Sequence, residues 1–441
     1  MRATIIQLAS RMRTARPLRA ALLLFLFLSA THFCPAYSVL THEEIVDLLW
    51  KDQIQPLLKK RFPEATDEDL RKAHAYAYGG SLVQDMGYYP FGNKYFSDLV
   101  HYVRSGDFVV IMIQESSDLN EYAFALGALS HYSADNSGHP TINRVVTMEF
   151  PKLAKKYGER ATYADNPKAH IRTEFGFDMV QVAKNRYTSD RFHDFIGFEV
   201  SKDLLNRAFY RTYGMQLEDV FGNTDLAIGT FRRSISIVIP EMTRVALLAR
   251  KQEIVKDTPN FDKKKFLYYL SRKQYEKEWG KGYRKPGVGT RILAFFLRIV
   301  PKVGPFSALG FKIPTQKTED MYIKSVNTTV EDYSKRLHDT RVQDLKLPNK
   351  DCDTGRDTKA GEYSLTDKSY ERLLKQLTDK KFEHLTPQLQ ENILEFYADL
   401  NAPIYTKRNK KAWTTTLANV ERLRAASPSR DSSPSITEIG Q

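Results

Sequence analysis

The chain has 441 residues, of which 42% are hydrophobic and 12% aromatic, so it can bury a large core and is not a chain that stays unfolded for lack of apolar residues. Its length permits two or three domains or one large helical domain. The formal net charge of +13 favours anionic partners, such as phosphate-bearing lipids, nucleic acid or membrane surfaces, without choosing among them.

The N-terminus has the pattern of a secretory signal. Residues 1–20 carry five arginines and no acidic residue, and an apolar run of about a dozen residues follows them. That run has the length of a signal and is short for a helix that spans a bilayer. Small residues at Cys34 and Ala36 predict cleavage before Tyr37, with an uncleaved membrane anchor as the alternative. Cleavage would leave Cys352 as the only cysteine, so a core, a metal or both must hold the mature chain.

The mature chain is predicted to be all-α. Apolar residues recur at spacings of three and four over 42–62, 119–135, 170–187 and 241–255, as they do along one face of a helix. Strand-like alternation is rare, and its best candidate, FVVIMI at 108–113, is interpreted as buried helix or loop.

Composition divides the chain into five parts. These are a signal peptide (1–36), an organised helical block (37–250), a basic and partly apolar helical extension (251–345), a polar linker with a small helical region (346–424) and a Ser/Pro-rich tail expected to be disordered (425–441). The linker is the stretch PNKDCDTGRDTKAGEY.

Histidines and acidic residues recur with helical spacing in the middle of the block. His131 and Asp135 lie four residues apart at the end of an apolar helical pattern, and His170 and Glu174 repeat that spacing. Side chains four apart share a helix face, so each pair can reach one metal ion. Gly138 and Pro140 predict that the first helix ends there, which would place His139 in the turn beyond it.

Three further candidates lie upstream, in or beside apolar stretches where an unpaired polar group would be costly to bury. They are His42, Asp85 and His101. His74 has no acidic neighbour in the sequence and is interpreted as structural or as a residue that supports a metal ligand. His193, His338 and His384 lie in polar sequence and are interpreted as solvated. Imidazole with carboxylate favours zinc, and ligand type leaves manganese or iron open.

These motifs resemble the zinc-dependent phospholipase C family. The resemblance rests on YSVLTHEEI, QDMGYYP, HYSADNSGH and HIRTE, within roughly residues 37–180. The family includes the catalytic domain of glycosylphosphatidylinositol-specific phospholipase D, whose His-x3-Asp-x3-His spacing is the closer one, and it is related to three-zinc, single-strand-specific nucleases. The resemblance implies an all-α catalytic domain over 37–250 that binds up to three zinc ions.

The resemblance also implies a role for each candidate. Asp85, His101, His131 and Asp135 would bind one zinc ion, and His139, His170 and Glu174 a second. The third ion would be bound by His42, by Asp135 as a bridge, and by the α-amino group and carbonyl of the first mature residue. Tyr37 lies five residues before His42, as the family requires, although many members have Trp there. Asp85 would orient or deprotonate the attacking water.

The expected activity is therefore hydrolysis of a phosphodiester by a zinc-activated water, with phospholipase C chemistry on phospholipid head groups as the leading case. Zinc-dependent cleavage of single-stranded nucleic acid or nucleotides is the alternative. Two further readings stay open, namely a protein that binds zinc or lipid without turnover and a helical protein whose histidines are merely packed. No obligate protein partner is evident, and the protein is expected to be secreted or periplasmic.

The sequence specifies the substrate less closely than it specifies the metal ligands. The aromatic residues that follow Asp85 could cage a choline ammonium, stack a base or simply pack in the core; they are Tyr88, Tyr89, Phe91, Tyr95 and Phe96. Residues 291–311 are apolar and aromatic and are flanked by Lys and Arg, as an element at a membrane surface would be, and the alternative is a buried helical hairpin.

Overall fold

The computed structural model describes residues 38–183, 197–239, 242–243, 246, 310–340 and 345–428. The signal peptide, Tyr37, His193, the membrane-surface segment up to residue 309, most of the helix expected over 241–255 and the tail from residue 429 lie outside the described residues. The described chain is all-α, as predicted, with one two-stranded antiparallel hairpin.

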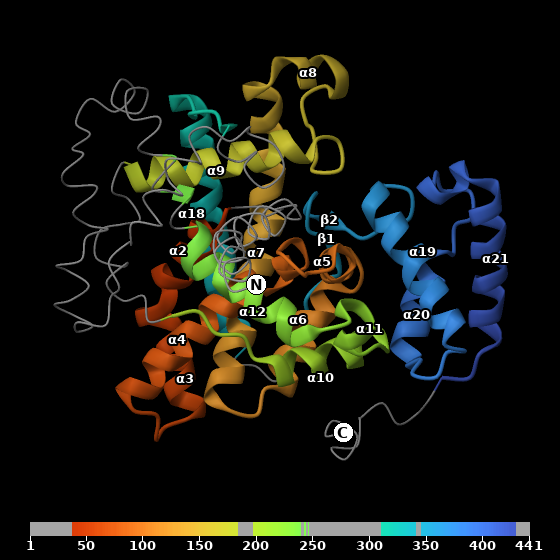
Figure 1. The fold of residues 1–441 in the computed structure, drawn as a ribbon, viewed down its shortest axis with the longest axis horizontal. Coiled ribbons are helices and arrows are strands. Elements are labelled where there is room, and N and C mark those ends of the chain that lie inside the picture. Colours follow the sequence, from red (N-terminus) through yellow and green to blue (C-terminus); the bar gives the residue numbers. More distant parts are fainter. Residues whose placement is uncertain are drawn as a thin grey trace, which may run out of the picture.

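Figure 1 shows the arrangement of these elements. In chain order they are α2 (Val39–Leu49), a π-helical turn (Trp50–Ile54), α3 (Gln55–Arg61), α4 (Asp67–Leu82), a 3-10 turn (Val83–Tyr88), α5 (Lys94–Tyr102), α6 (Ser105–Glu115), α7 (Leu119–Glu149), α8 (Pro151–Tyr157), α9 (Pro167–Ala183), α10 (Lys202–Tyr213), α11 (Leu217–Phe221), α12 (Thr224–Arg233), another π-helical turn (Ser234–Val238), α18 (Gln316–Asp339), β1 (Lys350–Asp351), β2 (Arg356–Asp357), α19 (Ser364–Asp379), α20 (Pro387–Phe396), another 3-10 turn (Tyr405–Arg408) and α21 (Lys410–Ala425).

The long helix α7 is the central element, and α4 and α18 pack along it. The α4–α7 contact is a backbone-to-backbone approach, because Cβ atoms added at Gly80 and Gly127 would overlap the carbonyl oxygens of Phe124 and Ala77. Glycine is needed where two helices come this close. The approach brings the end of α4 within hydrogen-bonding distance of the His131 ring on α7.

Capping residues fix where several helices begin. Asp118 accepts hydrogen bonds from the backbone N–H groups of Asn120 and Glu121 at the start of α7, and a reciprocal pair of bonds between Thr66 and Asp69 opens α4. Such bonds satisfy N–H groups that have no partner inside the helix. The starting points of the two helices that carry the central contact are therefore encoded locally.

The structure contradicts one sequence prediction about helices and confirms another. The prediction that α7 ends at Gly138 and Pro140 was wrong, because the helix continues to Glu149 with Pro140 inside it. A proline at this position offers no N–H to the carbonyl oxygen of Asn136. Gly355 instead packs against that oxygen and against the Pro140 ring. The alternating segment 108–113 is helical, as interpreted, and forms most of α6.

Residues 348–363, interpreted as a polar linker, pack against the helical block. Strands β1 and β2 pair with Lys350 opposite Asp357 and Asp351 opposite Arg356. The residues between the strands include buried Cys352 and Asp353. In Figure 1 the hairpin lies between α5 and the C-terminal helices α19, α20 and α21. It therefore connects the two groups of helices through contacts as well as through the chain.

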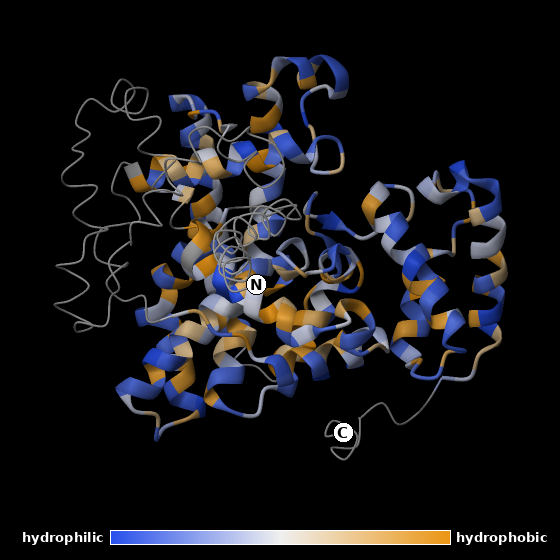
Figure 2. Ribbon diagram, viewed as in Figure 1, coloured by the Kyte–Doolittle hydropathy of each residue, from blue (hydrophilic) through white to orange (hydrophobic). Residues whose placement is uncertain are grey.

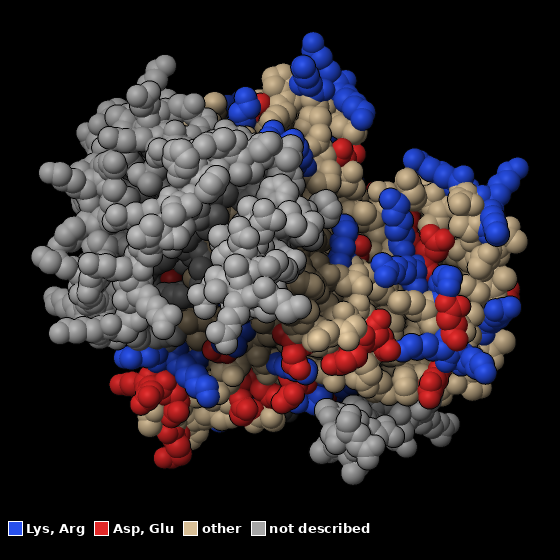
Figure 3. Space-filling view, viewed as in Figure 1, with Lys and Arg blue, Asp and Glu red and all other residues tan. Residues whose placement is uncertain are grey.

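In Figure 2 the helices carry both hydrophilic and hydrophobic residues, as amphipathic helices around a core do. The main core is continuous from α2 to α21 within the described residues. On the described part of the face in Figure 3, Lys and Arg side chains are interspersed with Asp and Glu. Among the helices that were described, none combines the length and apolar character that crossing a bilayer requires.

Candidate metal centre

Eight of the nine expected metal ligands lie in the described residues, and the structure brings all eight into three neighbouring groups. They come from α2, the 3-10 turn after α4, α5, α7 and α9, and each side chain is buried. They are His42, Asp85, His101, His131, Asp135, His139, His170 and Glu174. Tyr37, the ninth, lies outside the described residues.

The first group contains Asp85, His101 and His131, with Asp135 beside them. The Nε2 atoms of His101 and His131 are 3.2 Å apart. Asp135 Oδ2 lies 3.2 Å from Nε2 of His101 and 3.1 Å from Nε2 of His131. Asp85 Oδ1 lies 3.5 Å from Nε2 of His101. Four potential ligand atoms of the type expected for zinc therefore face a common point.

The other oxygen of Asp135 faces a second group. Asp135 Oδ1 lies 3.7 Å from Nε2 of His42, whose ring stacks on that of His131 at 4.4 Å between ring centres. Asp135 is thus oriented to bridge two groups, as the family resemblance implies. The structure also places His131 within reach of the His42 group, a proximity that the sequence interpretation did not include.

The third group contains His139, His170 and Glu174. His170 Nδ1 lies 2.7 Å from Glu174 Oε1, and His139 Nε2 lies 4.0 Å from the same oxygen. His139 belongs to α7 itself, because that helix continues through Pro140. It therefore extends the row of His131 and Asp135 by one more turn, and α9 supplies the other two residues.

The donor set fits zinc. Two nitrogens bound tetrahedrally at Zn–N distances of about 2.0–2.1 Å are roughly 3.3 Å apart, close to the spacings in the first group. Several buried atoms that face these groups form no hydrogen bond within the described structure. They are both carboxylate oxygens of Asp85, of Asp135 and of Glu174, Nε2 of His139 and Nδ1 of His170. Cations would satisfy these atoms, which would otherwise be costly to bury.

The environment shifts the pKa values of the ligand side chains in different directions. Burial raises the pKa values of Asp85 and Glu174 well above their usual range, which opposes the charged forms that bind metal. Burial also lowers the pKa of His170 to about 4, which keeps its ring neutral and able to bind. Burial raises the pKa of Asp135, but His131, His101 and His139 outweigh it and hold that pKa well below the usual value. Asp135 therefore stays ionised at neutral pH.

Each of four histidines has its other ring nitrogen fixed by a carbonyl oxygen. His101 Nδ1 donates to Ser97 O at 2.7 Å, and His131 Nδ1 donates to Ser81 O at 2.8 Å. His139 Nδ1 donates to Cys352 O at 2.7 Å, and His170 Nε2 donates to the Asn143 side-chain oxygen at 2.9 Å. Because a carbonyl oxygen only accepts, these bonds assign the proton and leave the other nitrogen available as a ligand.

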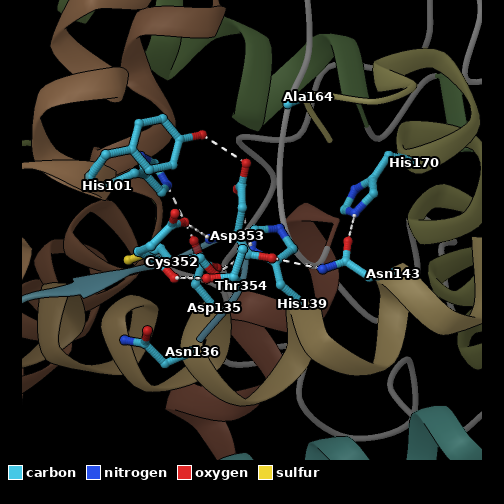
Figure 4. A network of polar contacts seen from close by, with 12 residues as sticks. His101, Asp135, Asn136, His139, Asn143, Ala164, His170, Cys352, Asp353 and Thr354 are labelled. Atoms are coloured by element: carbon cyan, nitrogen blue, oxygen red, sulfur yellow. Dashed lines mark hydrogen bonds and ion pairs between the residues drawn. The ribbon is translucent and has the colours of Figure 1, made fainter. Parts of the chain in front are cut away.

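Sequence reasoning missed the residues that support the ligands. Asn143 follows His139 by four residues, so helical spacing could have indicated it. Asp353 lies 3.5 Å from His139, measured from its Oδ1 to Nδ1 of the ring, and Figure 4 shows both next to Asn143 and His170. No spacing rule connects α7 to a residue more than 200 positions away.

The other histidines that the structure describes lie apart from the three groups. His74 has a structural environment, as interpreted, with its Nε2 2.8 Å from Asp47 Oδ1 and its ring stacked on Trp50. His338 is exposed, as interpreted. The interpretation of His384 as solvated was wrong, because its ring is half-buried and hydrogen-bonded to the Tyr210 hydroxyl at 2.9 Å.

The aromatic residues after Asp85 separate into different environments. Tyr89, Tyr95 and Phe96 belong to the main core, and Phe91 is about half exposed. Tyr88 lies beside the centre, with its ring 6.3 Å from that of His101 and 6.3 Å from that of Tyr163. The Tyr163 ring in turn lies 6.1 Å from that of His170. Tyr88 and Tyr163 therefore form an aromatic pair that extends from the first group to the third.

Comparison with known proteins agrees with this geometry. A family model described as zinc dependent phospholipase C matches residues 41–223, the segment that carries all eight described ligand candidates. No curated protein and no solved structure matches the chain. The match supports a phospholipase C-like hydrolase function, and the His, Asp and Glu groups suit zinc. Over residues 41–223, a segment that is under half of its length, the chain is therefore similar to the zinc-dependent phospholipase C family.

Proposed function

We propose that the protein is a zinc-dependent phosphoric diester hydrolase that cleaves phospholipids by phospholipase C chemistry. The observation that carries the proposal is the first group, where the ligand atoms of His101, His131 and Asp135 lie 3.1–3.2 Å apart within a family-matched segment. Zinc ions bound there would supply positive charge that polarises a phosphodiester and lowers the pKa of a nearby water.

The chain's own residues then have separate roles. Asp85 faces the first group and is the residue we assign to accept a proton from the attacking water. The water oxygen forms a bond to phosphorus as the bond from phosphorus to the glycerol oxygen breaks. The glycerol oxygen takes up a proton, so the products are diacylglycerol and a phosphorylated head group. Tyr88 and Tyr163 lie beside His101 of the first group and His170 of the third, and we assign them to contact the head group.

The location of the reaction is also part of the proposal. Residues 1–36 would direct export, and their removal would then create a new α-amino group at Tyr37, five residues before His42. An α-amino group binds metal only after it loses its proton. We propose that processing completes the His42 group and that residues 291–311 contact the membrane surface that holds the substrate.

Parallel assays test this function. Zinc-replete protein is incubated with phosphatidylcholine vesicles and, separately, with single-stranded DNA, and diacylglycerol and nucleotide release are measured. The expected result is diacylglycerol release that stops after chelation and returns with zinc. Cleavage of DNA alone would replace the proposal with the nuclease alternative, and zinc-loaded protein inactive on both substrates would refute phosphodiester hydrolysis. N-terminal sequencing of exported protein should find Tyr37 first.

A further inference from the structure

The turn Cys352–Asp353 reaches the metal centre from outside the family-matched segment. It follows β1, and Figure 4 shows Cys352 and Asp353 between His101 of α5 and His139 of α7. The backbone N–H of Cys352 donates to His101 O at 3.2 Å, so the turn is hydrogen-bonded to a segment that carries a ligand of the first group.

The turn fixes the His139 ring directly. His139 Nδ1 donates to the backbone oxygen of Cys352, and this bond directs Nε2 toward Glu174. The equivalent bonds of His101 and His131 are made to Ser97 O and Ser81 O, which both lie within residues 41–223. His139 therefore differs from these two histidines in depending on a residue of the C-terminal region.

The turn fixes the His170 ring through one intermediate residue. His170 Nε2 donates to the side-chain oxygen of Asn143, and Nδ2 of Asn143 donates to the backbone oxygen of Asp353 at 2.8 Å. The second bond determines which end of the amide faces His170. Both histidines of the third group thus have their orientation determined by two consecutive carbonyl groups of one turn.

The side chain of Asp353 anchors the turn. Its Oδ2 accepts hydrogen bonds from the hydroxyl groups of Tyr102, at 2.9 Å, and of Tyr363. The Tyr363 oxygen also accepts a bond from the backbone N–H of Ala164 at 3.2 Å. The carboxylate is 1% exposed, and its Oδ1 lies 3.5 Å from His139 Nδ1.

Neighbouring contacts show that the turn packs against the helical block. The Tyr132 hydroxyl donates to Pro348 O at 2.6 Å, and the Asn349 side chain accepts bonds from Gly106 N and Asp107 N at the start of α6. Gly355 has φ +68°, and a Cβ added there would overlap the carbonyl oxygen of Asn136. The close seating against α7 therefore requires glycine at position 355.

We propose that the Cys352–Asp353 turn is a positioning element for the third metal group, which holds the His139 and His170 rings in the orientation that binds metal. The inference rests on the proposed function, because it assumes that His139, His170 and Glu174 bind zinc. It assigns the C-terminal region a part in the metal centre beyond the matched domain. Loss of such outer hydrogen bonds typically weakens metal binding 10–100-fold.

The test measures zinc affinity in full-length variants by competition with a chelator, with circular dichroism to verify folding. Gly355→Ala displaces the turn, and Asn143→Ala breaks only the link to His170. Gly158→Ala is the matched control, because Gly158 also has a positive φ, +79°, but no atom lies within 4 Å of its added Cβ. We expect both test variants to lower the zinc affinity of one class of binding site about 10–100-fold. The control should keep the wild-type affinities.

A double-variant experiment assigns the weakened class. In a His139→Ala background, which already lacks this site, Gly355→Ala should cause no further loss of zinc. The inference is overturned if folded Gly355→Ala and Asn143→Ala proteins bind zinc as the wild type does. It is also overturned if all zinc classes weaken equally, which would indicate a general structural role. A wild-type chain that binds no zinc would instead refute the proposed function itself.

Discussion

The carboxylate of Asp178 in α9 accepts a hydrogen bond from the backbone N–H of Leu40 in α2, with its Oδ2 at 3.0 Å. Its Oδ1 accepts another from the Thr41 hydroxyl at 2.6 Å. Asp178 thus caps the first turn of α2, two residues before His42, and links it to the helix that carries His170 and Glu174. The start of the described chain is therefore fixed by a side chain close to the metal centre.

We predict that Asp178→Ala weakens zinc binding at the His42 group. The substitution removes the acceptor for Leu40 N–H, and a buried donor left unsatisfied costs about 1–3 kcal/mol. Zinc affinity and the free energy of unfolding measure the effect. Asp178→Asn keeps an acceptor oxygen and should have the smaller effect on both. Equal zinc affinity in Asp178→Ala and the wild type would contradict the prediction.

Glycine at position 127 is predicted to be essential for the contact between α4 and α7. Gly127→Ala places a Cβ in overlap with Ala77 O, so the helices must separate and the bond from His131 Nδ1 to Ser81 O must lengthen. We expect a fall in the free energy of unfolding of more than about 2 kcal/mol, within the range for overpacked cores, together with weaker zinc binding.

Gly229→Ala is the matched control for this substitution. Gly229 lies inside α12, and no atom approaches its added Cβ within 4 Å. Alanine exceeds glycine in helix propensity by about 1 kcal/mol, so this variant should be as stable as the wild type or more so. Thermal and denaturant unfolding of the two variants compare the effects directly. If both variants lose equal stability, the close approach at Gly127 is not the cause.

The sequence predicted the helical class and the ligand candidates because both signals are local. Apolar spacing indicated α7 and α9, and the four-residue spacing of His131 with Asp135 and of His170 with Glu174 placed each pair on one face. The path of α7 through Pro140 was not predicted, because the usual effect of proline there is offset by tertiary contacts. In this chain those contacts include the packing of Gly355 against Asn136.

The role of residues 348–363 could not be predicted for a similar reason. Their polar composition is the one expected of a solvated linker, and nothing near them in sequence marks Asp353 as buried. Its partners Tyr102, His139 and Asn143 come from α5 and α7, which lie far away along the chain. Only the tertiary fold brings this polar turn to these buried polar side chains, so that each satisfies the other.

Removal of metal is predicted to destabilise the fold. Without cations, burial raises the pKa values of Asp85 and Glu174, and the nearby Asp135 charge raises them further, so the charged forms are costly. A ligand at 100 times its dissociation constant stabilises a folded chain by about 2.7 kcal/mol. We therefore expect a chelator to lower the melting temperature by several degrees and zinc to restore it.

Histidine variants test whether the fall in melting temperature on chelation comes from the third metal group. His170→Ala should lose one class of zinc, and its melting temperature should respond less to the chelator than that of the wild type. His338→Ala, at an exposed position on α18, should behave as the wild type does. A chelator response that is unchanged in His170→Ala would show that the third group does not contribute to it.

Glu149 at the end of α7 is predicted to make stability depend on pH. Its carboxylate accepts hydrogen bonds from Thr173 in α9, at 3.2 Å, and from Thr318 in α18, at 3.5 Å. Burial nevertheless raises its pKa from 4.5 to about 7. Between these two values the folded chain holds a proton that the unfolded chain has released, so the free energy of unfolding falls as the pH rises through this window.

Glu149→Gln tests this dependence because glutamine keeps the shape of the side chain and cannot ionise. At roughly 1.4 kcal/mol per pKa unit, the shift corresponds to a difference on the order of 3 kcal/mol. The variant should therefore match the wild type near pH 4.5 and become increasingly more stable than it up to about pH 8. Comparing the two proteins at each pH cancels the effect of histidine protonation on metal binding, which they share. Glu159→Gln, at an exposed position, should show no such trend, and a difference for Glu149→Gln that is the same at every pH would rule out its titration as the cause.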